Sequence, residues 1–65
     1  MKPTMTRDLA NAAGWDAANR AMRKAGRKQW SCEDYNIGVD VTNRLMLLAV
    51  DVPDYVKAAI REQGE

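Results

Sequence analysis

The sequence predicts a small all-α domain with two main helices and a short third helix, forming a helical homodimer. Three observations predict it. Apolar residues recur at helical spacing through most of the 65 residues, a serine at Ser31 opens a strongly apolar segment, and Gly26, Pro53 and Gly64 stand at segment boundaries. Residues 1–65 are expected to form a single helical domain, because a chain of this length builds at most one core.

The first helix is expected from about residue 6 to residue 25. One of its faces carries alanines, with Trp15 and Met22 as the bulky members, and basic residues occupy the opposite face. The larger apolar residues before Gly14 point away from the alanine face. Either the helix breaks near Gly14, or residues 1–13 form an N-terminal arm that packs elsewhere, such as on a second chain.

Ser31 is expected to begin the second helix. Asp34 follows at the spacing of a capping box, and Trp30 and Tyr35 have the spacing of a hydrophobic staple. These independent signals agree, so the sequence predicts a helix over about residues 32–50.

The apolar residues of this second helix cover an unusually broad arc. They spread over about 220°, whereas one packing stripe needs roughly 100°, so the helix must be covered from two sides. The chain's own first helix can cover one side, and a second copy is expected on the other. The residues expected at the dimer interface are Val41, Leu45, Met46 and Leu48. A strand over residues 37–42, where apolar and polar residues alternate, is the competing interpretation.

The third helix is expected to be short and to start after Asp51. Asp51 would be its N-cap, with Pro53 in the first turn and Asp54 at the capping-box position. Gly64 stands where this helix should stop.

The composition argues against catalysis and against a metal site. The chain has no histidine, so neither a Ser/His or Cys/His pair nor a Cys/His zinc site can form. The single cysteine, Cys32, cannot close an internal disulfide and fits a reducing compartment. The chain is therefore not expected to be an enzyme, and no catalytic residue, metal ligand or cofactor is assigned.

The hydropathy pattern predicts a cytoplasmic protein without a membrane span. The longest apolar run, residues 45–50, is far shorter than the ~20 residues that a spanning helix needs. Residues 1–9 are charged and lack the apolar region of a signal peptide.

Charge is distributed unevenly along the chain. Residues 1–30 have a net charge of +5 and residues 31–65 a net charge of −4, which together make the overall +1. Five basic residues lie between Asp16 and Glu33 with no acid among them, and like charges four apart on a helix cost a few tenths of a kcal/mol. The five are Arg20, Arg23, Lys24, Arg27 and Lys28.

This basic cluster has three interpretations: a solvated face, a contact for an acidic protein surface, or a contact for nucleic acid. A helix-turn-helix would read bases with the second helix, but phosphate would repel the acids Glu33 and Asp34 at its start. Aromatic residues and arginines dominate protein-binding hot spots. The expected partner-binding residues are therefore Arg20, Arg23, Arg27, Trp30 and Tyr35.

Part of the chain resembles a group of short helical accessory proteins encoded by temperate phages. The similarity lies in GWDAANRAMRKAGR at 14–27, Trp30, EDYN at 33–36 and NRL at 43–45, whereas residues 37–41 and those after Leu45 depart from it. It implies a protein that binds and disables a host protein, such as a quorum-sensing transcriptional regulator or a pilus motor. The expected function is therefore stoichiometric inhibition of a host protein in the host cytoplasm. A small nucleic-acid-binding regulator and a virion subunit are the alternatives.

Overall fold

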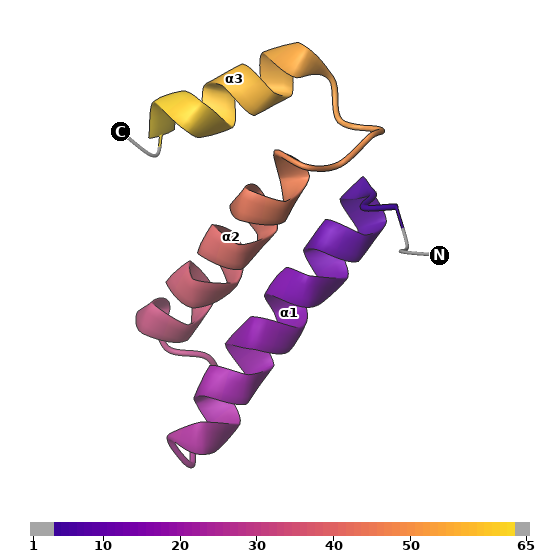
Figure 1. The fold of residues 1–65 in the computed structure, drawn as a ribbon. Helices are drawn as coiled ribbons and strands as arrows, with labels where there is room; N and C mark the ends of the chain where they lie inside the picture. The colour runs from indigo at the N-terminus through magenta and orange to yellow at the C-terminus, as the bar shows by residue number, and fades with distance from the viewer. Residues whose placement is uncertain (1–3, 64–65) are drawn as a thin grey trace.

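The computed structural model describes residues 4–63 and contains three α-helices: α1 over Arg7–Lys24, α2 over Cys32–Met46 and α3 over Asp54–Gln63 (Figure 1). The all-α prediction is confirmed. α2 runs through residues 37–42, so the strand interpretation of that segment was wrong. α1 continues through Gly14 without a break, and it includes residues 7–13, which the arm alternative had placed outside the helix. Residues 1–3 of that arm lie outside the described residues.

Local capping explains where α1 begins and ends. The Thr6 hydroxyl accepts a hydrogen bond from the Leu9 N–H at 3.3 Å. At the other end Gly26 has a φ of 74°, a left-handed conformation that favours glycine. The N–H of Gly26 donates to the Arg23 carbonyl and the N–H of Arg27 to the Met22 carbonyl, both at 3.0 Å. This pair of bonds is a Schellman motif, which turns the chain away from α1.

The capping box predicted at the start of α2 is confirmed. The Ser31 hydroxyl accepts from the Asp34 N–H at 3.2 Å, and the Asp34 carboxylate accepts from the Ser31 N–H at 3.0 Å. The helix ends at Met46, four residues before the expected residue 50. The chain turns there because Val50 donates its N–H to the Met5 carbonyl at 3.1 Å, and this bond ties the α2–α3 connection to the start of the chain.

Asp51 caps α1, which corrects the expectation that it would cap α3. Its carboxylate accepts a hydrogen bond from the Arg7 N–H at 2.7 Å. Arg7 is the first residue of α1, where backbone N–H groups lack intrahelical partners. This hydrogen bond therefore joins two residues that are 44 positions apart in the sequence, and it fixes the α2–α3 connection against the N-terminus of α1.

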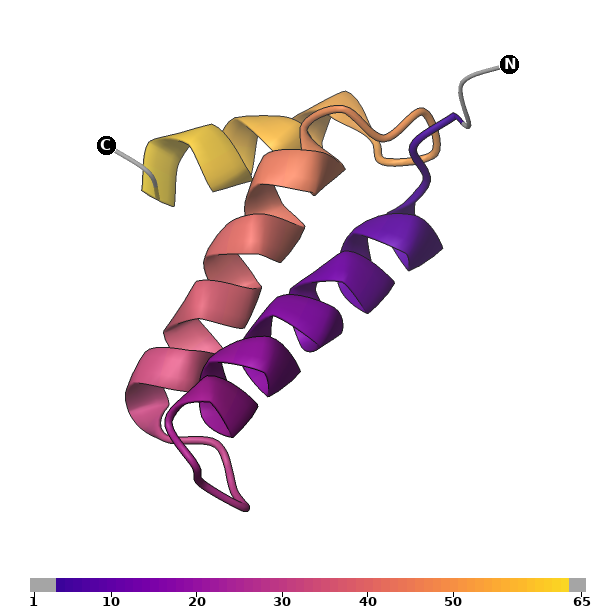
Figure 2. The ribbon, with the colours of Figure 1, turned by 60° about the horizontal axis from the view of Figure 1, so that its bottom comes forward.

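The helices form a flat layer. α1 and α2 run antiparallel, side by side, and α3 crosses beyond the end of α2 and packs along neither helix (Figures 1 and 2). The Cα atoms span 37 × 33 × 13 Å, and their radius of gyration is 12.9 Å, against about 10.7 Å for a compact domain of this length. Neither broad face of the α1–α2 hairpin is covered by a further helix in the described part of the chain.

The core is built from small side chains. The buried apolar residues are Ala10, Ala18, Ala49 and Val52. Many larger apolar side chains stay exposed instead: Leu9, Trp15, Tyr35, Ile37, Val39, Leu48, Val50 and Tyr55. The expectation that Trp15 belongs to the packed face of the first helix is wrong. α1 meets α2 along a row of small residues, and Trp15 stands about 100° around the helix from Gly14 in the middle of that row.

Candidate functional site

The two helices of the hairpin approach each other most closely at Gly14 of α1 and Gly38 of α2. A Cβ atom added to Gly38 would lie 2.8 Å from the Gly14 carbonyl oxygen and 3.1 Å from the Ala18 Cβ. One added to Gly14 would lie 2.7 Å from the Gly38 carbonyl oxygen and would overlap the Thr42 hydroxyl. Neither position accepts a larger residue unless the helices move apart. The backbone at this crossing forms the floor of a groove between α1 and α2.

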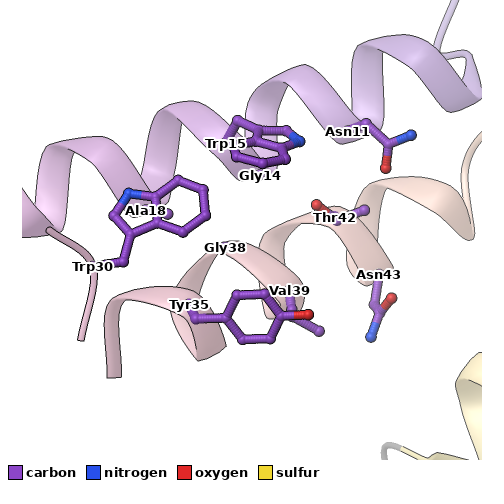
Figure 3. A pocket seen from close by; sticks show the side chains of 10 residues that line it. All are labelled: Asn11, Gly14, Trp15, Ala18, Trp30, Tyr35, Gly38, Val39, Thr42 and Asn43. Atoms are coloured by element: carbon purple, nitrogen blue, oxygen red, sulfur yellow. The ribbon is translucent and has the colours of Figure 1, made fainter. Parts of the chain in front are cut away.

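Two tryptophans form one wall of the groove (Figure 3). Trp15 comes from α1 and Trp30 from the loop before α2; their ring centroids are 4.7 Å apart and their planes are tilted by 45°. The Trp30 indole N–H donates a hydrogen bond to the Asn19 side-chain oxygen at 2.9 Å. Trp30 is therefore held on α1 by stacking and by a polar contact, while 61% of Trp15 remains exposed.

Tyr35 and Val39 of α2 form the opposite wall, and Tyr35 is 57% exposed. The groove is open to solvent and has a volume of about 250 Å³. Figure 3 shows Asn11 and Asn43 at one of its ends, away from Trp30. All of its lining residues are uncharged: Asn11, Gly14, Trp15, Ala18, Trp30, Tyr35, Gly38, Val39, Thr42 and Asn43.

Arg27, one of the expected partner-binding residues, pairs with Asp34, while 41% of its side chain remains exposed. Its Nε and Nη2 donate to the two carboxylate oxygens of Asp34 at 3.2 Å and 2.5 Å. The Ser31 N–H, and then the Arg27 guanidinium, hold the pKa of Asp34 below its ordinary value of 3.8, although burial acts in the opposite direction. This pair joins the loop after α1 to the first turn of α2 and so sets the position of Trp30 between them.

The remaining basic residues divide into paired and unpaired side chains. Arg20 forms an exposed ion pair with Asp16, with Nε and Oδ2 2.9 Å apart. Arg23, Lys24 and Lys28 are exposed and make no ion pair with any residue of 4–63. Helix α1 ends at Lys24. Of the like-charge pairs expected four residues apart, only Arg20 with Lys24 therefore lies within a helix.

Arg23 stands on the outer side of α1, about 180° around the helix from Gly14 at 100° per residue. Trp15, Asn19 and Arg23 follow one another at intervals of four residues, so they lie along one row of the helix surface. Trp30 packs against the first two members of this row. Because such a row drifts by about 40° per step, Arg23 is the cation one turn beyond Asn19 and points away from α2.

The residues expected at a dimer interface do not share one face. At 100° per residue, Leu45 points towards α1, close to the direction of Gly38. Met46 lies on the groove side of α2, whereas Val41 lies on the opposite side. Leu48 follows the end of α2 and is exposed.

The sequence identified two of the three groove aromatics, Trp30 and Tyr35. It missed Trp15, which was assigned to the packed face, and the crossing that brings the three together. The signal available was the spacing of small residues: Ala10, Gly14 and Ala18 recur every fourth position and form the buried row of α1.

Among the described residues, no helix combines the length and apolar character needed to cross a membrane, and no cluster of three or more His, Cys, Asp or Glu side chains is placed to hold a metal ion. Comparison with known proteins finds no matching family model, curated protein or solved structure.

Proposed function

We propose that this protein acts by stoichiometric binding to another protein, which it inhibits, and that the groove between α1 and α2 is the contact surface. The observation that carries the proposal is the gathering of Trp15, Trp30 and Tyr35, from three separate segments, around one open groove. Exposed aromatic side chains of this kind dominate the binding energy of protein interfaces.

The lining of the groove indicates the chemistry of the partner. An uncharged groove of about 250 Å³ favours an apolar side chain; for comparison, a dry cavity of about 150 Å³ holds a benzene molecule. Arg23 and Lys28, near the Trp30 end, favour a carboxylate beside that anchor. The partner segment therefore presents one large aromatic or aliphatic residue with an acidic residue close by.

The resemblance to temperate-phage accessory proteins supports inhibition of a host protein, such as a quorum-sensing transcriptional regulator, as the biological outcome. A protein of this size inhibits by occupying a surface that its target needs, without chemistry of its own. The function so proposed is that of a non-enzymatic anti-activator working in the host cytoplasm.

Nucleic-acid binding is the alternative function. Arg23, Lys24 and Lys28 supply charge for phosphate, and exposed tryptophans can stack on bases. No cation lines the groove itself, however, whereas a single-strand channel places cations along its length. A protein segment is therefore the better occupant.

The test compares two tyrosine truncations that are chemically identical. Tyr35 lines the groove and Tyr55 lies on α3, and both are exposed. Wild type, Tyr35→Ala and Tyr55→Ala are immobilised and used to capture proteins from nuclease-treated host lysate. We expect wild type and Tyr55→Ala to retain the same host protein in stoichiometric amount, and Tyr35→Ala to bind it at least about 10-fold more weakly.

Two results would contradict the proposal. Equal capture by all three proteins would show that the partner does not bind at the groove. Recovery of nucleic acid in place of a protein when nuclease is omitted, with a steep fall in affinity as salt is raised, would favour the phosphate-binding function.

A further inference from the structure

Each helix of the hairpin presents a row of side chains to the groove, and the two rows have the same spacing. Both rows step along their helix by four, three and four residues. At 100° per residue, with Gly14 and Gly38 marking the direction of the other helix, their members lie between about 40° and 100° from that direction. This is the spacing with which one helix meets a neighbouring helix in a coiled coil. The α1 row is Asn11, Trp15, Ala18 and Met22, and the α2 row is Tyr35, Val39, Thr42 and Met46.

The two rows are placed to pack against a third helix. In a bundle of three helices the axes stand at the corners of a triangle, so each helix meets one neighbour at about 60° from the other. This direction falls within the range of both rows. Among residues 4–63 the remaining helix is α3, and it packs along neither α1 nor α2 (Figures 1 and 2). Trp15, Tyr35 and Val39 are therefore exposed although they stand at core positions of a bundle.

We propose that the partner segment received by the groove is an amphipathic α-helix, which completes a bundle of three helices with α1 and α2. This inference rests on the function proposed above, and it adds the conformation and the direction of the partner segment. The α1 row extends over 11 residue steps, from residue 11 to residue 22, and so over about 16 Å. Apolar anchors at i, i+4 and i+7 of a docked helix span about 10 Å. Three anchors of one helix face thus fit within the length of the groove.

The polar groups of the groove favour a helix over an extended peptide. α1 and α2 are continuous through Gly14 and Gly38, so the backbone groups at the groove floor are bonded within each helix. The polar side chains Asn11, Thr42 and Asn43 gather at one end (Figure 3). An extended peptide would leave its own N–H and C=O groups without partners along the aromatic part of the groove. A docked helix avoids this cost, because its backbone is bonded internally.

Charges at the two ends of the groove give the docked helix a direction. Asp8 is exposed one turn before Asn11, about 120° around α1 from Gly14 and so on the groove side. At the Trp30 end, Lys28 is exposed and makes no ion pair with any residue of 4–63. A helix is stabilised by an anion near its N-terminus and by a cation near its C-terminus. The partner helix therefore runs parallel to α1, with its C-terminus beside Trp30.

The single cysteine provides a test of both conformation and direction. Cys32 is exposed and adjoins Trp30 and Tyr35 at one end of the groove. The probes are synthetic peptides of about 15 residues, a length at which alanine-rich sequences become helical in water. Leucine, methionine, phenylalanine or tryptophan occupies i, i+4 and i+7, and a cysteine stands at either the C-terminus or the N-terminus. Each peptide is equilibrated with the protein in a glutathione buffer, and the disulfide-linked complex is measured by mass spectrometry.

We expect peptides with a C-terminal cysteine to be trapped on Cys32 at least about 10-fold more than the same peptides with an N-terminal cysteine, because docking raises the local thiol concentration. A proline in the middle of the peptide breaks its helix and should abolish this excess. Val39→Glu places a charge in the groove and should abolish it too. Ile37→Glu, on the opposite side of the same helix, should leave it unchanged. Both side chains are exposed, so neither variant removes a buried contact.

Three results would overturn the inference. Equal trapping of the proline-containing peptides would show that the groove holds an extended segment, and would leave the groove in place as the protein-binding surface. Equal trapping from the two cysteine positions, or trapping that Val39→Glu does not reduce, would show that no helix docks in the proposed direction. A wild type that is dimeric in light scattering, and that Val39→Glu converts to a monomer, would show that a second copy fills the groove. The proposed function is tested separately, by the lysate capture with Tyr35→Ala.

Discussion

Asp34 shows how a single side chain can organise this fold. It is 1% exposed and accepts hydrogen bonds from the Ser31 N–H and from the Arg27 guanidinium. A buried carboxylate is tolerated only when it is paired and hydrogen-bonded, and both conditions are met here. The capping signal was readable from the sequence because Ser31 and Asp34 are neighbours. The role of Arg27 was not, because it depends on how the loop returns to α2.

The lowered pKa of Asp34 predicts acid sensitivity. Because the folded-state pKa lies below the ordinary 3.8, the ionised carboxylate contributes its full stabilisation above that pH. The contribution is lost as the pH falls through the folded-state pKa. We expect Asp34→Asn to lower the Tm at neutral pH and to flatten the fall in Tm below pH 3.8, measured by circular dichroism.

Asp16→Asn is the matched control, because Asp16 also pairs with an arginine but on the exposed surface. An exposed helical pair of this kind contributes about 0.5 kcal/mol or less. We expect this variant to have nearly the wild-type Tm at neutral pH and to show the same fall in Tm as wild type below pH 3.8. An Asp34→Asn variant with the wild-type Tm at neutral pH would show that the capping and pairing of Asp34 do not stabilise the fold.

At the scale of elements, the contact between α1 and α2 determines which side chains line the groove. Because Gly14 and Gly38 lack side chains, the backbones meet directly and the bulky residues stand to either side of the crossing. Trp15 and Tyr35 are therefore placed on one broad face, and Ile37 and Val41 on the other. Larger residues at positions 14 and 38 would hold the two backbones further apart.

Gly38→Ala tests the crossing. Alanine is favoured over glycine in a helix by about 1 kcal/mol, but its Cβ would lie 2.8 Å from the Gly14 carbonyl oxygen. Overpacking of this kind costs roughly 1–3 kcal/mol, so we expect a net destabilisation in urea unfolding and a changed near-UV signal from the groove tryptophans. A more stable Gly38→Ala variant would contradict the close crossing.

Gly26→Ala provides a comparison at the loop. Nothing lies within 4 Å of a Cβ at Gly26, and its φ is +74°. The cost there is conformational, about 1–2 kcal/mol, and we expect it to leave the environment of the tryptophans unchanged.

At the scale of the whole molecule, α3 is an appendage to the hairpin. It has no buried residue and packs along neither α1 nor α2. The connection before it is different, because Asp51 caps α1 and Val52 is buried. The structural boundary of the hairpin therefore falls after Val52, just before α3 begins.

Two truncations test this boundary. A chain that ends at Pro53 keeps Asp51 and Val52, and we expect it to retain the helicity of α1 and α2 and a cooperative melt. A chain that ends at Val50 loses both contacts, and we expect amide exchange in the first turn of α1 to accelerate and the Tm to fall further. Equal behaviour of the two chains would show that the connection does not hold α1.

The sequence by itself determined where α1 ends and where α2 begins: the glycine stop at Gly26 and the capping box at Ser31 depend on residues within a few positions of each other. The all-α class follows from the same local patterns. The sequence also identified two of the groove aromatics, Trp30 and Tyr35, as expected binding residues. The spacing that singled them out was that of a hydrophobic staple at the start of α2, not that of a groove.

The tertiary structure alone decided which surface these residues form. Asp51 caps α1 rather than α3, α2 stops at Met46, and Trp15 stands exposed beside Trp30, because each outcome depends on contacts between segments distant in sequence. Helical periodicity shows that a face is apolar without showing what it meets. In this chain the meeting point is a pair of glycines, so the packed faces are the small ones and the large side chains remain exposed.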